Sequence, residues 1–192
     1  MPKGDYLNTI LRSDKTVFSL KDIALLWQET DAKIAKARLN YYLQKGGLHH
    51  IRRGFYAKNK DYNRLEFATR VYTPSYISFE TGLASEGVIF QYHTTITVAS
   101  YLTRVIVADN QTYSYKKIKD TILIDPTGVQ QIDNVAIATK ERAFLDTLYS
   151  NPHYHFDNLR FLNWDQVFTI LPIYSNQRMT QAVNRLFHQE KN

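Results

Sequence analysis

The residues best suited to chemistry in this sequence are cations and amides gathered between Asp31 and Ala57. Lys and Arg side chains bind phosphate groups, and the amides of Asn and Gln can pair with the edges of nucleobases. The apolar residues Ala35, Leu39, Tyr42 and Leu43 recur at three- and four-residue spacing, so they share one face of a helix. The opposite face carries Lys33, Lys36, Asn40 and Gln44, with Arg38 and Tyr41 on its flank. Such a face is typical of nucleic-acid contact. The candidate contact residues are Lys33, Lys36, Arg38, Asn40, Tyr41, Gln44, Lys45, Arg52 and Arg53.

A helix followed by a hairpin must position these side chains. Asp31 is a suitable N-cap for a helix over 32–45, and Gly46-Gly47 ends that helix. Short strands are predicted over 48–51 and 55–57, with the two arginines at the tip between them. The hairpin therefore presents positive charge beside a basic helix.

The segments upstream complete a recognisable order of elements. We predict a helix over 6–11, a short strand over 16–18 and a second helix over 20–27, which Ser19 caps. Helix, strand, helix, turn, helix and hairpin is the order of a winged helix-turn-helix, in which the second helix of the pair enters the major groove of DNA. The alternative interpretation is a solvated basic helix beside an ordinary hairpin.

Charge is distributed unevenly along the chain. The net charge is +6. Residues 1–60 hold 12 Lys and Arg against 5 Asp and Glu, a net of +7, so the remaining residues carry −1. Such asymmetry predicts one module that binds nucleic acid joined to a module with another task.

The composition bears on the cellular compartment of the protein. Its 192 residues contain no cysteine, which excludes disulfides and thiolate chemistry and fits a reducing compartment. No apolar run approaches the ~20 residues that a membrane span requires. The first residues lack the apolar core of a signal peptide. We therefore expect a cytoplasmic protein without a membrane partner.

The fold class expected is α+β. An N-terminal winged helix-turn-helix over 1–60 is followed by a mixed α/β domain over 61–192, and the polar segment 58–63 is read as a linker. The second domain is expected to contain an antiparallel sheet and C-terminal helices. Its helices are predicted over 64–72, 79–85, 140–149, 164–170 and 176–189, and its strands over 88–90, 96–98, 104–108, 112–118 and 135–137.

Other groups of polar residues in the sequence give weaker indications of function. Lys116, Lys117 and Lys119 form a local basic cluster, which is either a solvated strand edge or a second phosphate contact. Glu80, Asp125, Asp133 and Glu141 are carboxylates that could serve as the metal ligands of a nuclease, but nothing in the sequence brings them together. Neither a nucleophile elbow nor a glycine-rich phosphate loop occurs. We therefore expect no catalytic residues, no metal and no cofactor.

Three motifs occur within residues 5–150. They are Gly47-Leu48 with Ile51-Arg52-Arg53-Gly54-Phe55-Tyr56, then Pro74 to Gly87, and then Ile137 to Tyr149. Together they resemble AbiEi-type antitoxins, the antitoxin half of type IV toxin–antitoxin systems, in which the motifs occur in the same order. Lys140, Arg142 and Gly82 depart from the usual Pro, Lys and Ala, and the tail beyond about 155 does not match.

The resemblance implies a bacterial winged-helix repressor whose second domain is an antitoxin. Family members bind inverted repeats in their own operator and counter a nucleotidyltransferase-like toxin, usually without forming a stable complex with it. Two alternatives stay open: a plain winged-helix regulator whose second domain senses a ligand or dimerises, and a metal-dependent nuclease. Within the second and third motifs we expect the polar members to be exposed, namely Glu80, Glu86, Glu141, Arg142 and Asp146.

Overall fold

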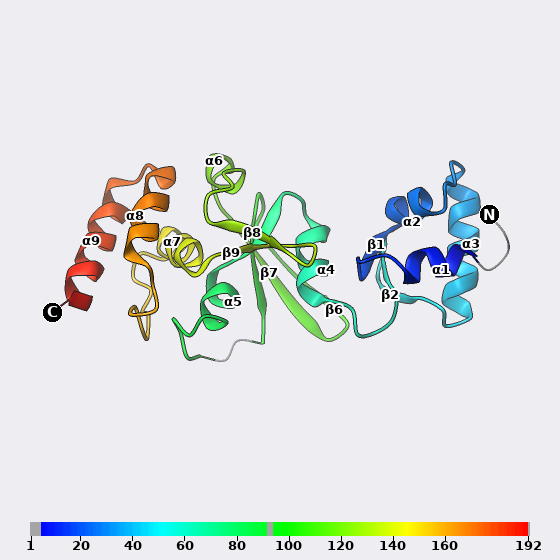
Figure 1. Cartoon of the computed structure of the whole chain (residues 1–192), viewed down its shortest axis with the longest axis horizontal. Coiled ribbons are helices and arrows are strands. Elements are labelled where there is room, and N and C mark those ends of the chain that lie inside the picture. Colours follow the sequence, from blue (N-terminus) through cyan, green and yellow to red (C-terminus); the bar gives the residue numbers. More distant parts are fainter. Residues whose placement is uncertain (1–4, 92–93, 192) are drawn as a thin grey trace. The chain divides into compact units, whose positions relative to one another are not determined.

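The structure, a computed structural model, describes residues 5–91 and 94–191. The chain divides into two compact units, the first ending at Phe67 and the second beginning at Ala68. The described residues form nine α-helices, one 3₁₀-helix, a three-stranded antiparallel sheet and a six-stranded mixed sheet (Figure 1). The predicted α+β class is therefore confirmed.

The first unit contains three helices and a small sheet. Strands β2 and β3 form the predicted hairpin, and β1 pairs with the other edge of β3, so the order is β1-β3-β2 with every pair antiparallel. The six elements follow the predicted order. They are α1 (Asp5–Leu11), β1 (Val17–Ser19), α2 (Leu20–Leu26), α3 (Ala32–Gln44), β2 (His49–Arg52) and β3 (Phe55–Ala57).

Local capping explains where the helices of this unit begin. Ser19 and Asp22 form a reciprocal capping box at the start of α2. The Asp31 carboxylate accepts hydrogen bonds from the backbone N–H groups of Lys33 and Ile34 at the start of α3. The apolar stripes of the three helices meet in one core, where the indole Nε1 of Trp27 donates to the carbonyl of Tyr6 at 2.7 Å.

The segment predicted as a linker belongs to the first unit. One carboxylate oxygen of Glu66 accepts hydrogen bonds from both the backbone N–H and the hydroxyl of Thr16, at 2.8 and 2.6 Å. Tyr62 is 5% exposed and its ring lies edge-on to Phe67. These contacts hold residues up to Phe67 on the first unit, so the compact unit extends seven residues beyond the predicted boundary after residue 60.

The second unit is built on a six-stranded sheet with the order β6-β7-β5-β4-β9-β8. Its strands are β4 (Ser75–Ile77), β5 (Ile96–Ser100), β6 (Arg104–Ala108), β7 (Gln111–Lys117), β8 (Val129–Ile132) and β9 (Val135–Ala138). Its helical elements are α4 (Arg64–Val71), which spans the boundary, α5 (Phe79–Ala84), α6 (Asp120–Leu123), α7 (Lys140–Ser150), α8 (Trp164–Ile170), η1 (Leu171–Tyr174) and α9 (Gln177–Lys191).

The expectation of an antiparallel sheet is wrong, because two strand pairs are parallel. Tight turns with positive φ at both central residues, Asp109-Asn110 and Asp133-Asn134, make β6–β7 and β8–β9 antiparallel hairpins. In contrast, β5 pairs with β7 and β4 with β9 in parallel. Each of these pairs is joined through intervening elements rather than by a tight turn, and such connections permit parallel pairing.

Several segments of the second unit, the unpredicted helix α6 among them, differ from the sequence prediction. Residues 88–90 form no strand, although Val88 and Ile89 are buried in the core beside the backbone of Asn158. Strand β8 was not predicted, because its Val-Gln-Gln-Ile sequence has no alternating apolar pattern. Apolar burial alone therefore does not distinguish a strand from a buried loop.

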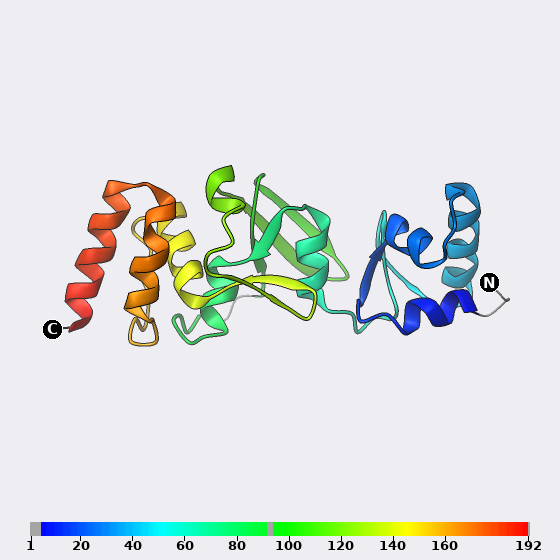
Figure 2. The same ribbon diagram turned by 45° about the horizontal axis from the view of Figure 1, so that its top comes forward.

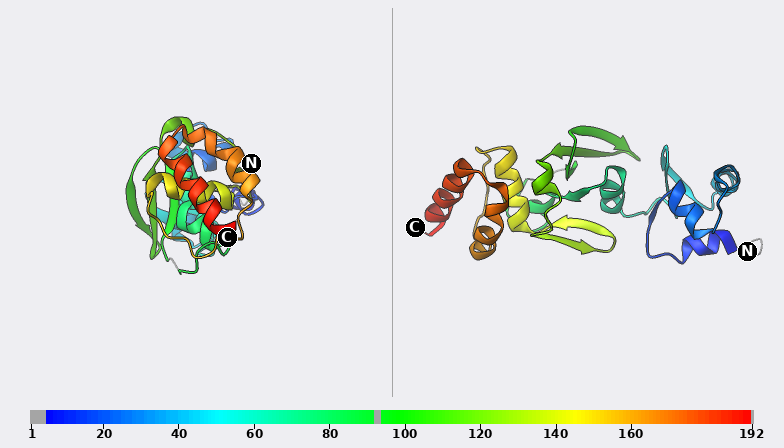
Figure 3. Two further views of the ribbon diagram at one scale, coloured as in Figure 1. Left: turned by 90° about the vertical axis from the view of Figure 1, so that its left-hand side faces the viewer. Right: turned by 90° about the horizontal axis from the view of Figure 1, so that it is seen from above.

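Helix α7 is the centre of the second unit. Its residues 141–148 are all buried, which requires other elements around every side of the helix. It packs against α5 and α8, and the views of Figures 2 and 3 show α7, α8 and α9 following one another away from the sheet. A Cβ atom at Gly82 of α5 would lie only 2.9 Å from Cβ of Ala143, so the two helices meet closely.

Candidate nucleic-acid interface

Helix α3 turns one polar face to solvent. Its inner face buries Ala35 and Leu39 in the core of the first unit. The 3.6-residue period of the helix then directs the opposite side chains outward. The exposed polar residues follow one another over about 16 Å of helix axis. They are Lys33, Lys36, Asn40 and Gln44.

Arg38 lies outside this face and is held within the unit. Its guanidinium donates to the Glu29 carboxylate at 3.3 Å and lies over the Tyr6 ring, 3.7 Å from the centroid. A cation over an aromatic ring and beside a carboxylate is a stabilising arrangement. Arg38 therefore positions α3 against the preceding turn and α1, a role that helical spacing alone did not reveal.

The two flanking candidates on α3 remain accessible. Tyr41 is 56% exposed, with its ring edge-on to Tyr42. Lys45 is the exposed C-cap residue of the helix. Both can extend the polar face formed by the four residues at its centre.

The arginines of the β2–β3 hairpin differ in their surroundings. Arg53 is exposed in the turn, which Gly54 closes with a φ of +87°, a conformation that favours glycine. Arg52 is half-buried at the end of β2, and its Nη1 is buried without an acceptor among the described residues. Arg53 is therefore the arginine that a phosphate can reach without a change in the hairpin.

The net charge coincides with the division into units. Residues 1–67 hold 13 Lys and Arg against 7 Asp and Glu, and residues 68–192 hold 11 of each. The first unit thus carries the entire net charge of +6. A long-range attraction to a polyanion acts on this unit rather than on the second.

The three lysines of the basic cluster in the second unit also differ in their accessibility. Lys116 donates to both carboxylate oxygens of Glu80, at 2.8 and 2.9 Å, and lies 4.7 Å from the ring centroid of Phe79. Lys117 and Lys119 are exposed, one at the end of β7 and one preceding α6. Only these two are directly accessible to a phosphate.

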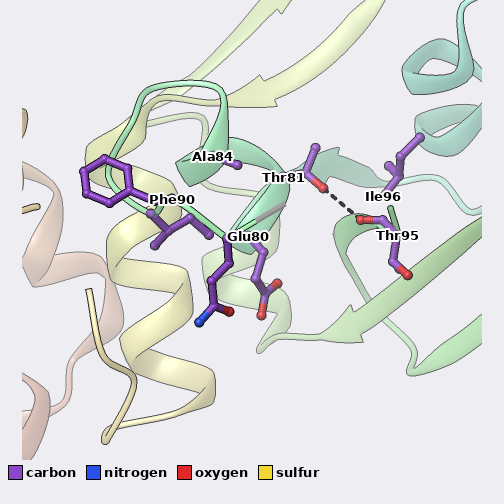
Figure 4. Close-up of a pocket in the computed structure, with 8 residues that line it drawn as sticks. Glu80, Thr81, Ala84, Phe90, Thr95 and Ile96 are labelled. Carbon is purple, nitrogen blue, oxygen red and sulfur yellow. Dashed lines mark hydrogen bonds between the residues drawn. The ribbon is translucent and has the colours of Figure 1, made fainter. Parts of the chain in front are cut away.

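Glu80 also lines a pocket of about 380 Å³ beside α5. Figure 4 shows the hydrogen bond between the Thr81 hydroxyl and the carbonyl of Thr95, 3.5 Å long, on one side of it. Phe90, on another side, is 69% exposed. The carboxylate of Glu80 is already neutralised by Lys116, so this pocket offers no unpaired charge from that residue.

The four carboxylates considered for a nuclease do not assemble. Glu141 accepts a hydrogen bond from the backbone N–H of Asn163 at 3.0 Å. Hydrogen bonds from Thr127 lower the pKa of Asp125. Within residues 5–91 and 94–191, no three His, Cys, Asp or Glu side chains gather closely enough to hold a metal ion. No helix among these residues is long and apolar enough to cross a membrane.

The second and third sequence motifs meet at a buried ion pair. Arg142 and Asp146 are both 0% exposed, and Arg142 Nε lies 3.4 Å from Asp146 Oδ1. The hydroxyls of Tyr76, Ser78 and Tyr174 donate to the carboxylate at 3.0, 2.7 and 2.7 Å. The guanidinium also donates to backbone carbonyls, at 2.6 Å for Ile122 and 2.7 Å for Thr127.

This cluster corrects the expectation that the polar residues of the second and third motifs are exposed. Arg142, Asp146 and Glu141 were expected to be exposed but are buried, whereas Glu86 is exposed and Glu80 is half-buried. Ser78 occupies the N-cap position of α5, yet its hydroxyl donates to Asp146 instead of capping the helix. The polar residues of these motifs therefore pair with one another inside the fold.

Burial and the neighbouring charges change the pKa values of the groups in this cluster. Burial raises the pKa of Tyr76 and Tyr174, so both phenols keep the protons that they donate. Burial alone would lower the pKa of Arg142, but Asp146 and the two tyrosines raise it overall. Burial raises the pKa of Asp146, while Arg142 and the three hydroxyls oppose that rise. Because every group around this carboxyl donates, the arrangement suits a carboxylate.

Comparison with known proteins adds no further likeness. No model of a known protein family matches the chain, and no curated protein matches it. The resemblance to AbiEi-type antitoxins therefore stays a prediction from the sequence. Its three motifs lie at the β2–β3 hairpin, along β4 and α5, and along β9 and α7.

Proposed function

We propose that the first unit is a winged helix that binds duplex DNA and represses transcription of the operon in which it is encoded. In this proposal α3 enters the major groove and the β2–β3 hairpin is the wing. The observation that carries it is the exposed face of α3. Two lysines and two amides follow one another there without an acidic residue between them, while the inner face holds the core.

The roles within this face follow from its chemistry. Lys33 and Lys36 are suited to phosphate contact, and Arg53 of the hairpin supplies a third cation. Asn40 and Gln44 are suited to base readout, because an amide can both donate to and accept from adenine. The neutral second unit contributes little to the electrostatic attraction, although Lys117 and Lys119 are available for an added contact.

We further propose that the second unit is an antitoxin that counters a nucleotidyltransferase-like toxin encoded next to it. Support for this step comes from the motif similarity. The residues in which the second and third motifs meet, Tyr76, Ser78, Arg142 and Asp146, are buried. They therefore support the shape of the unit, and the toxin-directed surface must use other residues such as the exposed Glu86.

Binding to DNA is tested by fluorescence anisotropy with a duplex from the promoter of the operon and a random duplex of equal length. Lys33→Ala with Lys36→Ala should lower affinity for both duplexes and reduce the slope of log K against log salt by about 1.8, or 0.9 for each lost phosphate contact. Asn40→Ala with Gln44→Ala should weaken promoter binding about 5- to 150-fold and spare the random duplex.

The matched control removes two exposed cations from the second unit, Arg160→Ala with Lys191→Ala. It should leave both the affinity and the salt slope unchanged. If this control reduces the slope as much as the α3 variants do, the charge of α3 has no special role. Promoter binding that survives loss of both amides would exclude them from base readout.

The antitoxin role is tested by co-expression of the full chain with the adjacent gene. A variant with Lys33, Lys36, Asn40 and Gln44 all changed to Ala should fail to repress a promoter fusion and should still protect cells from growth arrest. Loss of protection in this variant, at wild-type protein level, would contradict the assignment of the antitoxin task to the second unit. An adjacent gene that is harmless by itself would refute the antitoxin proposal while leaving DNA binding intact.

A further inference from the structure

A cavity of about 420 Å³ in the second unit lies between the end of α7 and the first half of α9. Its apolar part is formed by Leu148 and Met179, which are 2% and 5% exposed, and by Ala182. The ring of Tyr149 adds an aromatic surface. The volume falls within the range of about 300–1,000 Å³ typical of small-molecule sites.

Two arginines of α9 border the same cavity. Arg178 and Arg185 are exposed and seven residues apart, so they lie on one face of the helix, about 10 Å apart along its axis. Asn176 fixes the start of the helix, because its side-chain oxygen accepts the backbone N–H of Met179 at 3.2 Å. The partial positive charge of the helix N-terminus adds to that of Arg178.

The positive charges of Arg178 and Arg185 are not neutralised by an acidic side chain in the part of the chain that the structure describes. Among the described residues, neither Arg178 nor Arg185 takes part in an ion pair or hydrogen bond through its guanidinium. None of the nine residues that line the cavity is acidic. In the same protein, Arg142 and Arg38 are each paired with a carboxylate. The α9 arginines thus combine positive charge with an adjacent apolar surface.

We propose that this cavity binds a small organic anion. Its aromatic or branched apolar part would pack on Leu148, Met179 and Tyr149, and its carboxylate or phosphate would lie between Arg178 and Arg185. An inorganic anion would leave the apolar surface unused, and a neutral apolar molecule would leave the arginines unpaired. Occupation would join α7 to α9 through the ligand. This site is independent of the proposed DNA contact, since it lies wholly in the second unit.

Met179 lines the cavity and provides a direct test. In full-length protein labelled at the methionine methyl groups, the Met179 signal reports on the cavity. Phenyl phosphate and phenylacetate should each shift the Met179 signal in a saturable manner, and their relative affinities distinguish a phosphate from a carboxylate ligand. Inorganic phosphate and benzyl alcohol should each bind at least tenfold more weakly.

Arg178→Gln with Arg185→Gln should weaken both aromatic anions at least tenfold, whereas Arg160→Gln, an exposed arginine outside the cavity, should not. The Met179 signal of the ligand-free variant reports whether the cavity keeps its fold. Leu148→Ala is a second variant that should weaken binding by loss of apolar contact. The proposal is overturned if no aromatic anion shifts Met179, if benzyl alcohol binds equally well, or if the arginine variant binds like wild type.

Discussion

Changing Asp146 to Asn should destabilise the second unit more than any exposed substitution. The variant keeps the size of the side chain and removes its charge. Arg142 would then remain fully buried without a counter-ion, and three hydroxyl donors would lose their carboxylate acceptor. Tyr76 would be affected twice, because its hydroxyl also accepts from Arg142 at 2.8 Å.

The magnitude follows from these contacts. Removing one partner of a buried ion pair costs about 3–5 kcal/mol, mostly through the charge left behind. The remaining amide oxygen can still accept up to two of the donated bonds, which places the expected loss near the lower end of that range. With a urea m-value of about 2 kcal/mol/M, the midpoint of unfolding of this unit should fall by about 1.5–2 M.

The two tryptophans allow each unit to be followed separately. Trp27 lies in the first unit and Trp164 in the second, where it contacts Phe144 of α7. In a Trp27→Phe background, fluorescence during urea unfolding at pH 7 reports the second unit alone. The measurement compares Asp146→Asn with its parent in this background.

Glu86→Gln is the matched control, because it makes the same chemical change at an exposed carboxylate. Its midpoint should stay within the range of ordinary surface substitutions, about 0.5 kcal/mol. If Asp146→Asn is as stable as the control, Asp146 does not carry its charge in the folded protein. The reasoning from a buried ion pair would then be refuted.

Three further outcomes are expected. Arg53→Ala should reduce the salt slope of DNA binding by about 0.9 in anisotropy titrations without a change in thermal unfolding, and an unchanged slope would remove the hairpin from the interface. Gly82→Ala should cost about 1–3 kcal/mol in urea unfolding by overpacking against Ala143, and adding Ala143→Gly should recover part of this loss; no recovery would place the strain elsewhere. Above pH 10 the unfolded chain releases phenol protons that the folded state retains, so stability should fall by about 1.4 kcal/mol per pH unit for each buried phenol. Tyr174→Phe should show a shallower fall between pH 10 and 11, and parallel curves for both proteins would contradict its raised pKa.

Local sequence signals predicted much of the first unit. Capping residues act within a few positions of a helix start, which is why Ser19 and Asp31 located α2 and α3 correctly. The apolar period of α3 predicted that Ala35 and Leu39 face the core and that Lys33, Lys36, Asn40 and Gln44 face outward. The predicted strands over 104–108 and 112–118 likewise correspond to β6 and β7, which the positive-φ turn Asp109-Asn110 joins.

Tertiary contacts decided which charged residues are free. Arg38 was predicted on the flank of the polar face, but Glu29 and Tyr6 hold it, and Lys116 is held by Glu80 from another element. Periodicity reports the direction of a side chain from its own helix or strand and contains no information about partners elsewhere. The basic surface available for the proposed DNA contact is therefore smaller than the sequence indicated.

The sequence by itself determined the α+β class, through short-range helix and strand patterns, and the concentration of positive charge in the first third of the chain, through a count of charged residues. Only the tertiary structure decided the parallel pairing within the sheet and the burial of Arg142 and Asp146. The partners of Asp146 lie 70 residues away at Tyr76 and 68 away at Ser78, so no local pattern marks them. A charge can be buried there because these distant donors converge on it, and that convergence exists only in the folded chain.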